Sequence, residues 1–170
     1  MRRRILLGLA LVALLLGAGL WFALREPPLN LPRLDRIVVH KADRRMELYS
    51  GGRLVKVLTG LQLGDMPVGQ KHFEGDEKTP EGRYTIDFRN PQSDYHLSMR
   101  ISYPDAAANA YAATQGKSPG GEIYIHGQPN GLRVGRMAGD WTDGCIALSN
   151  REIEGLWRAV PLGTVVEVYP

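Results

Sequence analysis

The sequence predicts a mainly β domain with two small helices, preceded by one N-terminal transmembrane helix. Short runs in which apolar and polar residues alternate recur from residue 36 onwards, as expected for strands with one buried face. Only two segments, 104–115 and 149–160, have the composition or spacing of helices. An uncharged apolar run, 5–24, stands in front of them.

The front run follows three arginines and is long enough to cross a bilayer, since twenty helical residues cover roughly 30 Å. The positive flank favours a cytoplasmic N-terminus, which places the rest of the chain on the other side. A signal anchor over 1–24 fits better than a cleaved signal peptide, because the end of the run has no clear A-x-A cleavage site. Residues 25–35 contain three prolines and predict a short extended tether, followed by one domain over 36–170.

The net charge of +3 belongs to the front of the chain. Residues 1–25 contain four arginines and no acidic residue, which leaves 17 basic against 18 acidic residues in the rest. The body also lacks a cluster of basic and aromatic residues. We therefore expect no nucleic-acid partner.

The body begins with strand patterns separated by turns. Arg36–His40 predicts a first strand, and Met46–Ser50 and Arg53–Leu58 predict a hairpin around two glycines, which supply the positive φ angles of a tight turn. Residues 64–80 are polar and predict a solvated loop. Further strands are expected at 83–88, 95–103, 122–126 and 164–169, in a mostly antiparallel arrangement.

Two helices are expected between these strands. Residues 104–115 are rich in alanine and have Pro104 in the first turn, where proline is tolerated. In the second helix, 149–160, Ser149 and Glu152 have the spacing of a capping box.

The stretch 122–150 contains the residues that can carry chemistry. Cys145 is the only cysteine, so it cannot form a disulfide within the chain. A cysteine becomes an effective nucleophile when an imidazole lowers its pKa or takes its proton. His126 follows a short apolar strand pattern, and Cys145 precedes another, so both can project from strand ends. A Cys–His metal site is not expected, because the sequence has no close-spaced pair of such ligands. Glu74, Asp76 and Glu77 lack the spacing of a recognisable metal-binding loop.

At these residues the sequence resembles the L,D-transpeptidases with a YkuD-type catalytic domain. The resemblance rests on His126-Gly127, on Thr142-Asp143-Gly144-Cys145-Ile146 and on Thr79-Pro-Glu-Gly82, in that family's relative order, and covers about 36–170. It implies a mainly β domain of the L,D-transpeptidase type, a β-sandwich or barrel-like body, that acts on peptidoglycan stem peptides.

The resemblance also implies roles. Cys145 would attack the carbonyl of a diamino acid linked to D-Ala, release D-Ala and form a thioester, which an amine of another stem resolves. His126 would be the general base and acid, the Gly127 carbonyl would orient it, and the Gly144 and Cys145 amides would receive the oxyanion. No metal or organic cofactor is implied.

Two positions depart from the family's common pattern: Asp143 stands where His is frequent, and Ala147 stands where Arg is frequent. The WTDGC version resembles a branch with enzymes that detach lipoprotein from peptidoglycan, so a lipoprotein is a possible substrate. Water as the acceptor, which would make the chain an amidase or peptidase, is therefore an alternative, and a catalytically silent wall-binding module is another. A carboxylate beside the thiol disfavours the thiolate, unless Asp143 pairs with His126 or with Arg136.

The expected location follows from the anchor and the resemblance: a single-pass protein of the inner (cytoplasmic) membrane, with its catalytic domain on the periplasmic or cell-wall side. Candidates for substrate contact are Trp141, Thr142, Asp143, Tyr103, Arg136 and His96.

Overall fold

The computed structural model describes residues 29–132 and 135–170. The anchor expected over 1–24 lies outside these residues. Within the described ranges, no helix is both long and apolar enough to cross a membrane.

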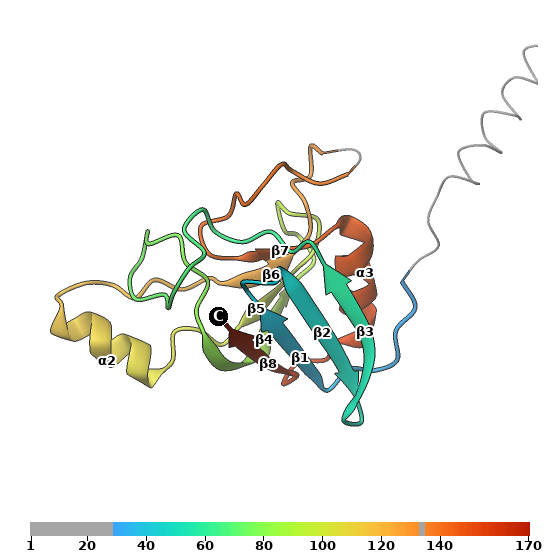
Figure 1. The fold of residues 1–170 in the computed structure, drawn as a ribbon, viewed down its shortest axis with the longest axis horizontal. Helices are drawn as coiled ribbons and strands as arrows, with labels where there is room; N and C mark the ends of the chain where they lie inside the picture. The colour runs from blue at the N-terminus through green and yellow to red at the C-terminus, as the bar shows by residue number, and fades with distance from the viewer. Residues whose placement is uncertain (1–28, 133–134) are drawn as a thin grey trace, which may run out of the picture.

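The body is built on one curled sheet of eight strands, in the order β3-β2-β1-β8-β4-β5-β6-β7 (Figure 1). The strands are β1 (Arg36–His40), β2 (Arg45–Ser50), β3 (Arg53–Thr59), β4 (Gly82–Asn90), β5 (Ser98–Ile101), β6 (Tyr124–His126), β7 (Ile146–Ala147) and β8 (Val165–Tyr169). Neighbouring strands are antiparallel, except that β1 pairs with β8 and β6 with β7 in parallel. The expected mainly β fold with two helices is confirmed.

The two helices have different roles. In α3 (Asn150–Ala159), Ser149 caps the first turn, and both hydrogen bonds of the predicted capping box are present. Ile153 and Leu156 of this helix are fully buried in the hydrophobic core. By contrast, α2 (Ala106–Thr114) buries only Ala112 and lies at the periphery of the body (Figure 1).

Part of the segment expected to be a tether packs against the domain. Leu29 and Leu31 contact the hydrophobic core, and Leu34 is 1% exposed. The Leu34 amide donates a hydrogen bond of 2.8 Å to the Ala159 carbonyl at the end of α3. Residues 29–34 therefore belong to the folded body, because their leucines complete its core.

Two expectations for loops and strands are corrected. The strand expected over 95–103 is regular only at β5, because His96 adopts a φ of 68°, which extended strands do not allow. The loop 64–80 is only partly solvated, since Lys71 and Thr79 are buried. Both segments border the cleft described next.

Candidate active site

The pairing of β6 with β7 places the side chains of the two catalytic candidates, His126 and Cys145, on one face of the sheet. Ile125 lies opposite Ile146, and both are fully buried in the core. Because side chains alternate along strands, the neighbours Tyr124, His126 and Cys145 face the other side. The Tyr124 amide lies 3.4 Å from Cys145 Sγ, and His126 follows two residues later on the same face.

His126 is held in one orientation by the backbone and by two rings. Its Nδ1 lies 2.7 Å from the Gly127 carbonyl, which can only accept, so Nδ1 carries the proton. The neutral ring therefore keeps a free lone pair on Nε2. The Tyr95 and Trp141 rings pack on the imidazole with centroids 4.7 and 5.6 Å away.

Burial sets the protonation state of His126. The imidazole is 3% exposed, and desolvation lowers its pKa, while the hydrogen bond to the Gly127 carbonyl acts in the opposite direction. The net pKa lies below the usual 6.5. The ring is therefore neutral at physiological pH, which is the state of a general base.

The Cys145 thiol is also uncharged at rest. Burial raises its pKa to about 11, and the charges of Asp143 and Glu122 act in the same direction. The Tyr124 amide and Lys71 oppose this rise but do not outweigh it. The site therefore holds a neutral thiol beside a neutral imidazole, not a preformed ion pair.

A tight turn presents Cys145 to the cleft. Thr142 Oγ1 donates to the Cys145 carbonyl over 2.8 Å and accepts from the Gly144 amide over 3.3 Å. Gly144 has a φ of 121°, and a Cβ there would lie 2.5 Å from the Lys78 carbonyl oxygen. Only glycine fits this position, because both the backbone angle and the contact exclude a side chain.

Three polar side chains hold the segment that leads from His126 to this turn. Gln128 is 1% exposed and donates to Gln62 Oε1 and to the Leu148 carbonyl. Gln62 Nε2 in turn donates to the Met137 carbonyl. Asp140 Oδ1 accepts from the Leu63 amide over 2.8 Å. Sequence reasoning missed these residues, because their partners lie far away along the chain.

The thiol and the imidazole line a cleft of about 680 Å³. Its walls come from the polar loop around 71–77, from 90–98, from the segment 120–126 and from the turn 141–145. Within the described ranges, no group of three or more His, Cys, Asp or Glu is placed to hold a metal ion.

The structure separates the six candidates for substrate contact into two groups. Trp141, Thr142 and Asp143 line the cleft. The other three do not: Tyr103 is buried and bonds to the Pro119 carbonyl, Arg136 pairs with Glu152, and His96 pairs with Glu154. The possible pairing of Asp143 with Arg136 is thus not formed, because Arg136 is engaged on α3.

Residues 34–168 match the sequence model of the YkuD L,D-transpeptidase catalytic domain. A curated relative from Escherichia coli strain K12, putative L,D-transpeptidase YafK, is 28% identical over 147 residues, which are 79% of this chain and 53% of the relative. The chain thus spans about half the length of the curated relatives it matches.

Solved structures show the same fold. The helical cell shape determining protein Pgp2 of Campylobacter jejuni is 28% identical, with a TM-score of 0.59 over 85% of this chain and 51% of that one. An L,D-transpeptidase of Xylanimonas cellulosilytica is 15% identical, with a TM-score of 0.52 over 85% of this chain and 65% of that one. The L,D-transpeptidase-type fold is therefore confirmed.

The charge of Asp143 gives a first prediction. Asp143→Asn removes a negative charge near Sγ, so the pKa of Cys145 falls and more thiolate forms at pH 8. We expect iodoacetamide to alkylate Cys145 about two- to fivefold faster, a small gain because exposed charges interact weakly. The gain should shrink in 1 M salt.

Glu74→Gln is the matched control, since it removes another exposed carboxylate that lines the same cleft. Its alkylation rate should equal that of the wild type. An Asp143→Asn variant that is alkylated more slowly than the wild type would contradict the role of this charge.

Proposed function

We propose the function of this chain from two facts: it belongs to the YkuD family of L,D-transpeptidase catalytic domains, and its cleft joins a cysteine to a buried histidine. It is a peptidoglycan L,D-transpeptidase, with Cys145 as nucleophile and His126 as general base and acid. The observation that carries this proposal is the protonated Nδ1 of His126, which leaves Nε2 free to take the thiol proton.

The reaction begins when a stem peptide enters the cleft and places a carbonyl carbon against Cys145 Sγ. Sγ attacks this carbon while His126 Nε2 takes the thiol proton, so the thiolate never needs to accumulate. Because the thiol is a weak acid and the imidazole a weak base at rest, proton transfer has to accompany the attack. The imidazolium that forms is held in place by the Gly127 carbonyl.

The tetrahedral intermediate then collapses. Backbone amides at the turn donate hydrogen bonds to the oxyanion. To do so, the Gly144 amide must break its long hydrogen bond of 3.3 Å to Thr142 Oγ1. Nε2 returns its proton to the departing amine of D-Ala, and a thioester to Cys145 remains. An amine of a second stem attacks the thioester, and His126 again takes the proton.

The relatives agree with a role in the cell wall. YafK carries the description of a putative L,D-transpeptidase, and Pgp2 that of a determinant of helical cell shape. Since this chain spans about half of each, we transfer only the transpeptidase chemistry of the shared domain.

Incubation with tetrapeptide muropeptides tests the reaction. We expect the wild type to release D-Ala and to form cross-linked dimers. Cys145→Ala and His126→Ala should each lose at least about a thousandfold in rate, as when the nucleophile or base of a catalytic pair is removed. His40→Gln is the matched control, because that imidazole stacks on Tyr169 away from the cleft.

The products also separate the alternatives. Trimmed peptides without dimers would replace the amine with water as acceptor, and release of peptide from a linked lipoprotein would show a detaching enzyme. A fully active Cys145→Ala variant would overturn the enzyme proposal.

The pH dependence follows from the two resting groups. The neutral form of His126 is the base, so activity is lost as the pH falls through its pKa, which lies below 6.5. We expect kcat/KM to rise with a midpoint below pH 6.5 and to stay flat up to about pH 9, because the thiol ionises only near 11. A profile that rises steadily to pH 10 would instead make the free thiolate the reactive species.

We place the domain on the cell-wall side of the cytoplasmic membrane, held there by the apolar run 5–24, because stem peptides are found there. Protease added to spheroplasts that express the full chain should degrade the domain and spare a cytoplasmic marker. Deletion of 1–24 should protect the domain until lysis. A full-length domain that resists protease in spheroplasts but not in lysates would contradict this location.

A further inference from the structure

Lys71 is a buried cation in the wall of the cleft. It is 4% exposed, and its Nζ donates to Asp76 Oδ1 over 2.8 Å and to the Phe73 carbonyl over 3.0 Å. These are the two acceptors that Nζ contacts among the described residues, whereas an ammonium has three N–H donors. One donor therefore remains for a ligand in the cleft that Lys71 lines.

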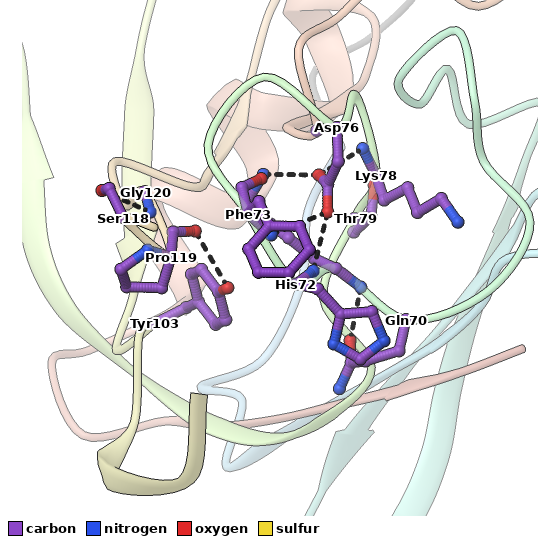
Figure 2. A network of polar contacts seen from close by, with 12 residues as sticks. Gln70, His72, Phe73, Asp76, Lys78, Thr79, Tyr103, Ser118, Pro119 and Gly120 are labelled. Atoms are coloured by element: carbon purple, nitrogen blue, oxygen red, sulfur yellow. Dashed lines mark hydrogen bonds and ion pairs between the residues drawn. The ribbon is translucent and has the colours of Figure 1, made fainter. Parts of the chain in front are cut away.

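Asp76 does not fully neutralise this cation, because its charge is shared among four donors. Besides Lys71, its carboxylate accepts from the amides of His72, Phe73 and Lys78, as Figure 2 shows for this loop. Burial raises the pKa of Asp76, but the hydrogen bonds from Lys71 and the amides lower it further, and the net pKa is below its usual value. Asp76 therefore stays ionised and holds the Lys71 side chain in place through their ion pair.

The loop that carries Lys71 packs closely against the turn that contains Cys145. The Lys78 carbonyl touches Gly144, and a Cβ at Gly64 would lie 1.9 Å from the Glu77 carbonyl oxygen. Burial dominates the raised pKa of Cys145, and the charge of Lys71 acts in the opposite direction. Lys71 thus has a fixed place in the wall of the cleft that Cys145 also lines.

The rest of the cleft is acidic. Five carboxylates line it: Glu74, Glu77, Asp94, Glu122 and Asp143. Lys71 is the only Lys or Arg among the described residues that line it, and His126 is neutral. A ligand with both carboxylate and ammonium groups can therefore place a carboxylate favourably at Lys71, and its ammonium groups at the acidic walls.

We infer that Lys71 binds the free carboxylate of the residue that the reaction expels, and so fixes the direction in which the peptide lies in the cleft. This inference rests on the proposed function, in which the expelled residue is the C-terminal one. Its carboxylate is then a few bonds from the carbonyl attacked by Cys145. Lys71 thereby places the penultimate carbonyl, and not another one, at Sγ.

Two small electrophiles test carboxylate binding without any catalysis. Iodoacetate carries a carboxylate, whereas iodoacetamide of the same size does not, and both alkylate the same thiolate. The ratio of their rates at Cys145 therefore cancels any change in the pKa of the thiol. We expect Lys71→Met to lower the iodoacetate-to-iodoacetamide ratio about tenfold, the loss of one charge-assisted hydrogen bond.

Three further variants keep the test interpretable. Lys71→Arg should retain most of the ratio, because it retains the charge. Lys71→Met combined with Asp76→Asn removes the buried pair without leaving Asp76 unpaired, which guards against unfolding. Lys78→Met is the matched control on the same loop, since Lys78 does not line the cleft, and its ratio should equal that of the wild type.

The result that would overturn the inference is an unchanged ratio in both Lys71→Met variants. The ratio also stays unchanged if both alkylation rates fall by the same factor, and in that case Lys71 acts only on the reactivity of the thiol.

Peptide substrates separate this inference from the proposed function. The wild type should prefer a tetrapeptide with a free C-terminal carboxylate over its amide through a lower KM, and Lys71→Met should lose that preference. If neither peptide reacts with the wild type while the alkylation ratio still falls in the variant, the proposed function fails and carboxylate binding by Lys71 stands. If both peptides react equally well with the wild type, the inference fails and the function stands.

Discussion

The parallel pairing of β6 with β7 is the constraint on which the site depends. These two short strands are joined by a long connection, yet their register puts Ile125 opposite Ile146 and so fixes the faces of all their neighbours. A shift of one residue would turn Cys145 into the core and Ile146 into the cleft. The two fully buried isoleucines resist that shift, because exposing either would lose roughly 2 kcal/mol of burial. The packing of these isoleucines in the core therefore fixes the positions of His126 and Cys145 on the opposite face of the sheet.

The connection between these strands shows what local sequence could and could not predict. The capping box of α3 was predictable because Ser149 and Glu152 are three residues apart, and its two hydrogen bonds join only these two residues. The bracing by Gln62 and Gln128 was not, since the two side chains are 66 positions apart. A glutamine in a strand or loop carries no local signal for such a partner. Only the packed fold shows that both are buried.

The difference between local and long-range contacts also explains which predicted substrate-contact residues line the cleft. Trp141, Thr142 and Asp143 reach the cleft because they precede Cys145 on one tight turn, so the location of Cys145 also locates them. His96 lies in the strand expected over 95–103, but its positive φ breaks that strand, and its ring contacts Glu154. Lys71 was overlooked inside a loop that read as solvated. Its burial depends on the acceptor Asp76 and on the packing of its loop, through Lys78, against the turn at Gly144, which composition does not reveal.

The raised pKa of Cys145 limits how readily the resting thiol reacts. A pKa of about 11 leaves on the order of one thiol in 10,000 ionised at pH 7. Oxidation and disulfide exchange proceed through the thiolate, so the resting cysteine is protected from both. This protection does not prevent the proposed reaction, because His126 Nε2 takes the proton only as a bound carbonyl meets Sγ. In the proposed reaction, burial thus couples the activation of Cys145 to the arrival of the substrate, and the proposed carboxylate contact of Lys71 selects which carbonyl arrives.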